Sequence, residues 1–251
     1  MKSRIIIGLF LIILIPINIF SADTNKKINT KLKKIDDLYK KYNEDKDNLE
    51  ILKKATNIFD SLVSNHPNND ELLWKAAESC YKLAEEKEKD KIKLKIYKKG
   101  KKYASKSIDI NSKCGMGYFW KATLTAKIAQ SQGIAKSISM IKPMRNMAKK
   151  SIKYNPDFGP AYHLLAKIYT KAPGWPISIG DDKKALHYRI KSTEFSPNNY
   201  SYKWELYKNY KNLDKTEKAI ETLNSIINSE TRNNFHEKLK KIAKKELKEI
   251  K

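Results

Sequence analysis

The chain has 251 residues, of which 40% are hydrophobic, and its 52 Lys and Arg outnumber 28 Asp and Glu to give a formal net charge of +24. This apolar content suffices for the core of one large domain or two small ones, which excludes a collagen and a disordered tail. The only cysteines are Cys80 and Cys114. Two cysteines exclude a disulfide scaffold and a multi-thiolate zinc or iron–sulfur site.

Residues 1–22 have the pattern of a secretory signal peptide. A positively charged start precedes an apolar run from Ile5 to Phe20, as in the n-region and h-region of such signals. We predict cleavage after Ala22, which leaves a domain of residues 23–251 that is exported to the periplasm. An uncleaved N-terminal anchor is the alternative, because the bulky Phe20 stands where a small residue is expected. The run is shorter than the ~20 residues of a spanning helix, which ranks the anchor second.

The positive charge does not by itself predict nucleic-acid binding. Only four of the 52 basic residues are arginines, whereas specific recognition of phosphates and bases favours arginine. We interpret the lysines as the solvated faces of helices and predict no nucleic-acid partner. Attraction to an anionic membrane surface, and hence peripheral membrane contact, is the functional alternative.

Apolar residues recur at spacings of three and four, which predicts an all-α protein. Residues 72–84 and 219–227 show this spacing clearly. Asp214, with Glu217 three residues later, predicts a capping box at the start of the second of these helices. We expect a C-terminal helix over residues 233–250 as a cap.

Similar segments recur along the chain and mark the boundaries of helical repeats. Residues 151–162 (SIKYNPDFGPAY) superpose on residues 107–118 (SIDINSKCGMGY). Four equivalent turn positions are spaced by 45, 44 and 41 residues: Pro67, Ser112, Pro156 and Pro197. These spacings exceed the ~34 residues of a tetratricopeptide repeat (TPR), so each repeat is expected to carry an insertion.

The third repeat resembles the TPR superfamily. Tyr162, Leu165, Ala166 and Tyr169 match the aromatic, leucine, small residue and tyrosine of the first TPR helix. The resemblance implies a TPR-like α-solenoid of four or five antiparallel helix pairs, here with long insertions and a C-terminal capping helix. It also implies that the first helix of each pair lines a concave groove.

A narrower resemblance covers about residues 70–230. Its motifs are residues 133–143 (GIAKSISMIKP), 151–156 (SIKYNP), 173–176 (PGWP) and 180–186 (GDDKKAL). They resemble the T-component (TatT) family of TRAP-type transporters and, more distantly, the regulator-of-microtubule-dynamics group. The T-component resemblance implies an exported, non-catalytic protein that binds a hydrophobic ligand or assists a substrate-binding protein. This chain lacks the lipoprotein cysteine that would tether it to a membrane.

Four residues share one position in the repeats, seven residues after each boundary: Trp74, Phe119, His163 and Trp204. In the TPR register they would form an aromatic ladder along the groove, suited to a hydrophobic small molecule or to the side chains of a partner. Tyr81 on the first of these helices is a further candidate. The alternative is that the insertions cover the groove and the ladder is ordinary core.

The segment from Pro173 to Pro176 cannot continue a helix. It predicts a loop that carries Trp175, either as a lid or contact loop for the groove or as a plug for the gap that the insertion opens. Cys80 lies in the middle of a predicted helix and Cys114 in the turn before the next repeat. This separation favours two unpaired thiols.

No catalytic or metal-binding pattern is found in the sequence. The four histidines lack the spacing of metal ligands, and neighbouring carboxylates lie beside lysines or at helix starts. We therefore predict that the protein is not an enzyme and has no metal, cofactor or catalytic residues.

The expected function is binding in the groove. The partner is a hydrophobic small molecule or a protein, and the TRAP resemblance implies a periplasmic solute-binding protein and an accessory role in solute uptake. One alternative is an envelope scaffold or assembly adaptor at an anionic membrane surface. The lesser alternative is a periplasmic hydrolase whose carboxylates meet across repeats. The sequence leaves the ligand and the partner unidentified, and a homo-oligomer remains open.

Overall fold

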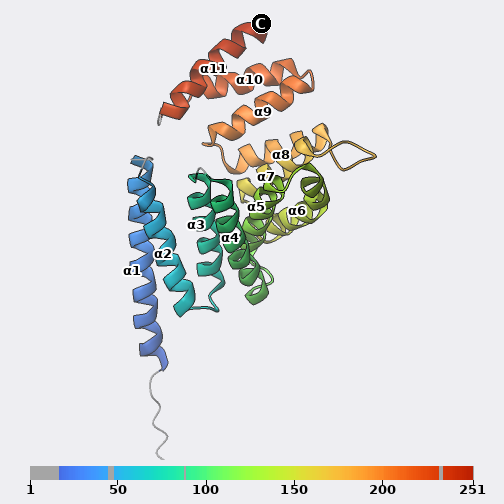
Figure 1. Ribbon diagram of the computed structural model, residues 1–251. Helices are drawn as coiled ribbons and strands as arrows, with labels where there is room; N and C mark the ends of the chain where they lie inside the picture. The colour runs from blue at the N-terminus through green and yellow to red at the C-terminus, as the bar shows by residue number, and fades with distance from the viewer. Residues whose placement is uncertain (1–16, 45–47, 88, 232–233, 251) are drawn as a thin grey trace, which may run out of the picture. The chain divides into compact units, whose positions relative to one another are not determined.

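The computed structural model describes residues 17–44, 48–87, 89–231 and 234–250, and these form eleven α-helices and no strand (Figure 1). The predicted all-α fold class is thereby confirmed. Most of the predicted signal peptide, residues 1–16, lies outside the described ranges. None of the helices in those ranges has both the length and the hydropathy that a membrane crossing requires.

The chain divides into two compact units, residues 1–58 and 59–251. The first contains α1 (Ile17–Glu44) and the larger part of α2 (Leu49–Asn65). Ile35 and Leu52 are fully buried there. The backbone of α1 is helical on both sides of the predicted cleavage point after Ala22.

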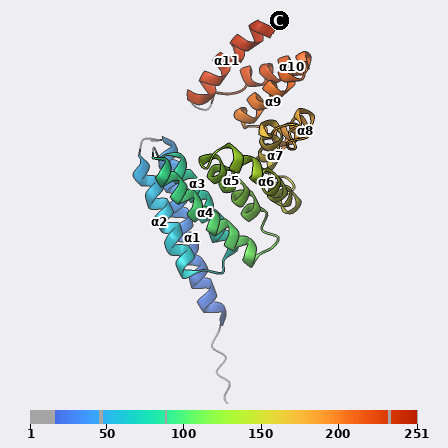
Figure 2. The ribbon, with the colours of Figure 1, turned by 45° about the vertical axis from the view of Figure 1, so that its right-hand side comes forward.

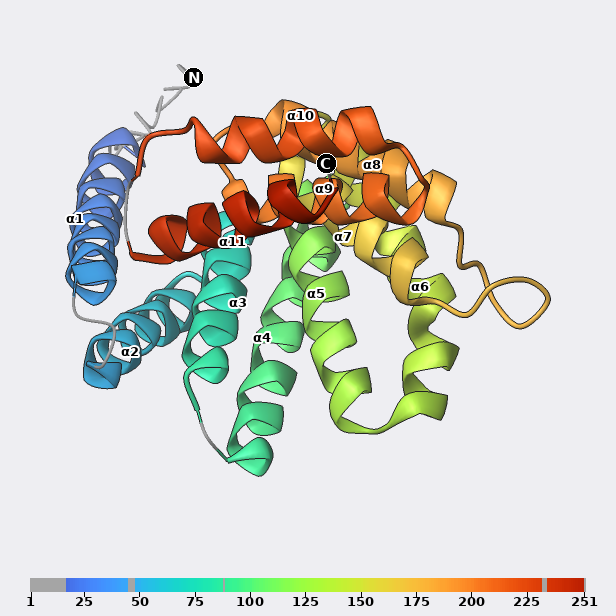
Figure 3. The same cartoon turned by 90° about the horizontal axis from the view of Figure 1, so that it is seen from above.

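The second compact unit contains four helix pairs and a final single helix. The pairs are α3 (Asp70–Glu85) with α4 (Asp90–Ile110), α5 (Gly115–Ser131) with α6 (Ile134–Tyr154), α7 (Gly159–Lys171) with α8 (Asp182–Phe195), and α9 (Tyr200–Asn212) with α10 (Thr216–Ile227). The helices of each pair contact each other, and the second helix of each pair contacts the first helix of the next (Figure 2). The last helix, α11 (Asn234–Ile250), packs against α10 (Figure 3). This is the predicted TPR-like solenoid with its capping helix.

The predicted repeat boundaries fall in the turns before the first helix of each pair, at Pro67, Ser112, Pro156 and Pro197. Asparagines in these turns begin the next helix. The Asn69 side chain accepts a hydrogen bond from the Leu72 backbone N–H at 2.9 Å, and Asn199 accepts one from Tyr202 at 3.3 Å. Each cap satisfies a backbone donor that the first helical turn leaves without a partner.

Small residues let the paired helices approach closely. Ala77, Ala122 and Ala166 share one position, ten residues after each boundary, and all three are fully buried. A Cβ atom on Gly100 of α4 would lie 2.8 Å from the Cβ of Cys80 on α3. Glycine is therefore required at position 100 by the distance between these two helices.

The insertions are accommodated in two ways. In the first two pairs they lengthen the second helix, since α4 and α6 have 21 residues each and the segment from Gly133 to Pro143 forms the start of α6. In the third pair the insertion is a loop between α7 and α8 that protrudes from the helices (Figures 1 and 3). Trp175 in this loop is 89% exposed, so it is not tucked between helices.

The predicted capping box at Asp214 is wrong. Asp214 has a φ angle of 54°, and Lys215 stands at the N-cap of α10 without a side-chain hydrogen bond. The Lys215 backbone N–H instead bonds the carbonyl of Tyr210 at 3.0 Å. Asp214 is thus part of the turn that ends α9, where aspartate tolerates the left-handed conformation.

Both cysteines are buried and free, which confirms the prediction of unpaired thiols. Cys114 stands at the N-cap of α5, where its sulfur accepts a hydrogen bond from the Gly117 backbone N–H at 3.3 Å.

Candidate functional site

The residues of the aromatic ladder lie on the first helices of the four pairs but differ in burial. Phe119 is buried, with its ring centroid 5.0 Å from that of Phe158. Phe119 belongs to a hydrophobic cluster of buried side chains, and Trp74 is partly buried against that cluster. Trp204 is partly buried in a second cluster, where its ring lies 5.0 Å from that of Tyr207.

The fourth member, His163, stacks on Tyr202 with 4.1 Å between the ring centroids. Phe119, His163 and Trp204 therefore each pair with a ring outside the ladder. The structure brings Trp74 and Phe119 into one hydrophobic cluster and places Trp204 in another.

Tyr81 belongs to a cluster that joins the first and second pairs. Its ring centroid lies 5.4 Å from that of Trp120 on α5, and the Lys127 ammonium lies 5.5 Å above its ring. Lys127 also forms a 2.7 Å ion pair with Glu85, whose carboxylate accepts a hydrogen bond from the Tyr97 hydroxyl. Burial, together with the Glu85 charge, raises the pKa of Tyr81 to about 12, so its hydroxyl remains a donor at neutral pH.

A buried arginine that the sequence analysis missed lies at the third pair. Arg189 of α8 is 3% exposed, and its Nη1 lies 3.3 Å from a carboxylate oxygen of Glu205 on α9. Its Nη2 donates a hydrogen bond to the Thr170 hydroxyl at 3.1 Å. The Arg189 Nε atom has no hydrogen-bond partner among the described residues. Burying a guanidinium costs folding free energy, and leaving one of its N–H donors without a partner adds to that cost. Few proteins bury such a group.

The repeat register contains the signal for this arginine. Arg189 lies eight residues before the boundary at Pro197, while Ala104 and Ala148 lie eight residues before the two preceding boundaries. Both alanines are fully buried. A charged residue where two repeats have a buried alanine could have been recognised from the sequence.

Burial lowers the pKa of His163 to about 3, and the positive charges of Lys167 and Arg189 contribute to this shift. The imidazole is therefore neutral at pH 7. Partial desolvation of the exposed Lys167 lowers its own pKa, and the charges of Lys171 and Lys127 lower it further. The ammonium groups of α5 and α7 thus lie close enough to repel one another.

We call this surface the basic-aromatic face and define it by side chains of the four first helices: Tyr81, Trp120, Lys127, His163, Lys167 and Tyr202. The charge of Tyr202 on α9 also contributes to the raised pKa of Tyr81 on α3. Within the described part of the chain, Trp120 Nε1, Thr123 Oγ1 and His163 Nδ1 are buried without a hydrogen-bond partner. The face therefore presents rings and ammonium groups, with these unpaired polar atoms buried beneath them.

The carboxylates beside this face are held in the ionised form. Burial opposes the ionisation of Glu85 and Glu205, but hydrogen bonds from neighbouring lysines outweigh it and lower both pKa values. A general acid needs the opposite shift. In the ranges that the structure describes, no three His, Cys, Asp or Glu side chains gather as metal ligands.

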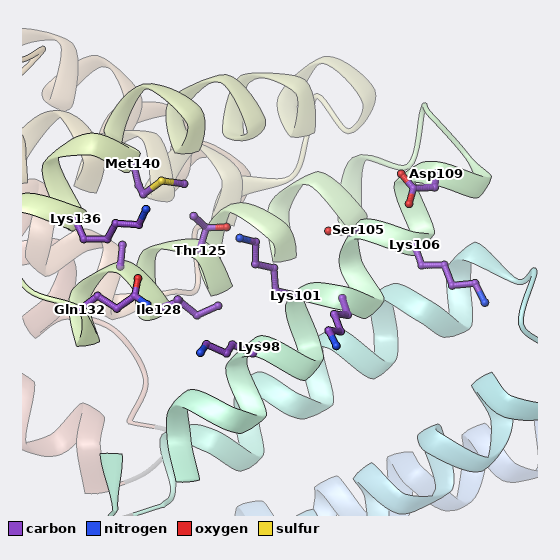
Figure 4. Close-up of a pocket in the computed structure, with 12 residues that line it drawn as sticks. Lys98, Lys101, Ser105, Lys106, Asp109, Thr125, Ile128, Gln132, Lys136 and Met140 are labelled. Atoms are coloured by element: carbon purple, nitrogen blue, oxygen red, sulfur yellow. The ribbon is translucent and has the colours of Figure 1, made fainter. Parts of the chain in front are cut away.

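Two cavities lie away from the aromatic ladder. One of about 620 Å³ lies between α4, α5 and α6 and has several lysines around it (Figure 4). The other, of about 610 Å³, lies where the turn before α9 meets the start of α11. Ligand binding by the ladder predicts that Trp74, Phe119 and Trp204 face an enclosed cavity, but other residues line both of these cavities.

Comparisons with known proteins agree with the geometry. The chain is similar in structure to TTC0263, a thermophilic TPR protein of Thermus thermophilus, with a TM-score of 0.64 and 12% identity over 86% of this chain and 97% of that chain. Similarity to YrrB, described as a TPR protein with an unusual peptide-binding site, has a TM-score of 0.49 and 13% identity over 76% of this chain and 86% of the other. A search of curated proteins finds no match.

A family model described as regulator of microtubule dynamics protein 1-3 matches residues 31–169. This match covers more than half of the chain and includes α3 to α6 and nearly all of α7. The solved structure with a TM-score of 0.64 supports a TPR fold for the same region. The T-component resemblance remains a prediction. The chain therefore has a TPR-like fold and belongs to the regulator of microtubule dynamics protein 1-3 family.

Proposed function

We propose that this protein is a non-catalytic scaffold that binds an acidic segment of a partner protein on the basic-aromatic face. The observation that carries the proposal is the approach of Lys127 and Lys167, on neighbouring first helices, beside the stacked rings of His163 and Tyr202. Rows of first helices that present rings and charges suit an extended or helical peptide.

The excess of positive charge on this face favours a partner segment with negative charge. The charges of Lys171 and Lys127 contribute to the lowered pKa of Lys167, and the nearby Glu85 and Glu205 are already paired with lysines. A carboxylate from a partner would relieve the repulsion around Lys167. Aromatic or aliphatic side chains next to that carboxylate would pack on the exposed edges of the rings.

The proposal is tested with synthetic peptides of about 15 residues that carry three Asp or Glu residues around one Phe or Leu. Fluorescence anisotropy measures their binding to the chain, with Asn and Gln versions of each peptide as ligand controls. We expect the acidic versions to bind at least tenfold more tightly, and Lys167→Glu to remove this preference. Lys183→Glu makes the same charge change at an exposed site on α8, and it should leave binding within twofold of wild type. Equal binding of both peptide versions would contradict the proposal.

A hydrophobic small molecule in the groove, with an accessory role in TRAP-type uptake, is the second candidate. The partly buried Trp74 and Trp204 favour it. Native mass spectrometry of residues 23–251, compared with the denatured mass, decides between the candidates. Extra mass that is lost on denaturation would support a carrier of small molecules. A bare chain at its calculated mass agrees with the protein-binding scaffold, and the spectrum also reports the oligomeric state.

We also propose that the protein is exported and released by cleavage after Ala22, with an uncleaved anchor as the alternative. The intact mass of the protein purified from its native cells distinguishes a chain that begins at Asp23 from one that retains residues 1–22. Contact with an anionic membrane surface, the remaining alternative, predicts binding to acidic vesicles that disappears with added salt.

A further inference from the structure

The 620 Å³ cavity between α4, α5 and α6 is separate from the basic-aromatic face. Three helices contribute one face each to its walls, and Lys98, Lys101 and Lys136 extend toward it beside Gln132 and Met140 (Figure 4). Residues 98, 101 and 102 of α4 follow helical spacing, as do residues 125 and 128 of α5 with its C-cap residue 132, so the wall is built by regular helix faces. Its volume lies within the usual range of small-molecule sites.

The repeat register explains why this cavity exists. Thr125 lies thirteen residues after its boundary, and the same position holds Cys80 in the preceding repeat and Tyr169 and Tyr210 in the next two. Both tyrosines are buried and fill the corresponding space. Thr125 is 2% exposed and lines the cavity, and its hydroxyl has no hydrogen-bond partner among the described residues. The second pair therefore has a cavity where the next two repeats have a buried tyrosine side chain.

The lysines around the cavity have no carboxylate partner among the described residues. Some lysines on other helices do pair with carboxylates three or four residues away, as in the contacts of Lys75 with Glu71 and Lys82 with Glu78. For the five cavity lysines (98, 101, 102, 106 and 136), no ion pair is found within the described ranges. Partial burial and the charges of Lys121 and Lys136 lower the pKa of Lys101. The only acidic residue of the wall is Asp109, which lies at the opposite end from Lys136 in Figure 4.

We propose that this cavity, which we call the lysine pocket, binds a small molecule that carries two or three phosphate groups. Lysine ammonium groups bind phosphate as point charges, and several of them around one hollow favour a compact, multiply charged anion over a single carboxylate. The Gln132 amide supplies a neutral donor. Ile128 and Met140 form an apolar wall for the part of the ligand that bears no phosphate.

The test is isothermal titration calorimetry of the full chain with inorganic triphosphate at 150 mM salt. We expect saturable binding with one site per chain. The double variant Lys101→Gln with Lys136→Gln should weaken it at least tenfold. The control is Lys142→Gln with Lys149→Gln, which removes the same charge from exposed positions of α6 outside the pocket, and it should change the affinity less than twofold. Thr125→Tyr should abolish binding by filling the hollow, with the melting temperature reporting its folding.

Two further arms identify the source of the phosphates. Binding to vesicles that contain a bisphosphorylated phosphoinositide, displaced by free triphosphate, would support a lipid headgroup as ligand. Triphosphate binding without vesicle binding would support a soluble phosphate compound. Failure to observe saturable binding of either probe would overturn the lysine pocket. An equal loss of affinity in the α6 control pair would also overturn it, because the attraction would then be a property of the whole surface charge.

Discussion

The imidazole of His163 on α7 stacks on the phenol ring of Tyr202 on α9, with 15° between the ring planes. This contact joins the third helix pair to the fourth. It buries the His163 Nδ1 atom, which has no hydrogen-bond partner among the described residues. A neutral imidazole tolerates this environment, whereas an imidazolium would lose its hydration beside Lys167 and Arg189.

The protein should therefore lose stability in mild acid through His163. Its pKa is about 3 when folded and near 6.5 when unfolded, so the unfolded chain binds the additional proton between these values. Stability from this group is complete above pH 6.5 and falls as the pH drops toward 3, by about 2 kcal/mol at pH 5. His163→Phe keeps an aromatic ring without the titration. Urea unfolding at pH 7 and pH 5 should show a smaller loss for the variant, and an equal loss in both proteins would contradict this assignment.

The ion pair of Arg189 and Glu205 leads to a second prediction. Glu205→Gln leaves a buried guanidinium without its counter-charge, and we expect a loss of about 2 kcal/mol in the free energy of unfolding. This is less than for a fully buried pair, because the Glu205 side chain is 32% exposed. Glu194→Gln removes the exposed partner of Lys191 and should change stability by less than ~0.5 kcal/mol. Similar effects of both substitutions would mean that solvent screens the Arg189 pair.

Repeat boundaries and helix spacing could be read from the sequence because each arises from local chemistry. Prolines end helices, and apolar residues at spacings of three and four mark a buried face. The capping box at Asp214 failed because the carbonyl of Tyr210, at the end of the previous helix, competes for the same turn. A local sequence pattern does not show whether a turn residue belongs to the end of one helix or to the start of the next.

The site was less predictable than the fold. The ladder position was placed on the first helices, but whether Phe119 faces the groove or the core depends on Phe158 of the following turn. Arg189 and Thr125 carried a usable signal, since Arg189 replaces an alanine of the two preceding repeats and Thr125 replaces a tyrosine of the two following repeats. The approach of Lys127 to Lys167 has no sequence signal, because it depends on how two pairs stack.

Cys80 and Cys114 should not react with thiol reagents while the protein is folded. Burial raises the pKa of Cys80 to about 12 and also raises that of Cys114, so little thiolate is present at pH 8. Treatment with an aromatic disulfide reagent should label no thiol in native buffer and two thiols per chain in urea. Fewer than two labelled thiols in urea without reductant would indicate an oxidised cysteine and contradict the free pair.

Trp175 should contribute almost nothing to stability. Its side chain is 89% exposed on the loop between α7 and α8, so Trp175→Ala removes little buried area. We expect the midpoint of thermal unfolding to stay within about 1 °C of wild type, since surface substitutions of this kind change stability by less than ~0.5 kcal/mol. A loss of several degrees would instead show that the indole plugs a gap between helices. The experiment therefore tests whether the exposed indole leaves the packing of the helices unaffected.

Gly100→Ala should destabilise the protein although alanine is the better helix former. In an exposed helix the change gains up to ~1 kcal/mol, but here the new methyl group meets Cys80 Cβ at 2.8 Å and Leu124 Cδ1 at 3.1 Å. Separating α4 from α3 to relieve this overlap should cost about 2 kcal/mol net, as other overpacked cores do. Lys95→Ala, at an exposed position of the same helix, should change the free energy of unfolding by less than ~0.5 kcal/mol. If urea unfolding shows Gly100→Ala to be as stable as wild type, the close approach of these two helices is not required by the fold.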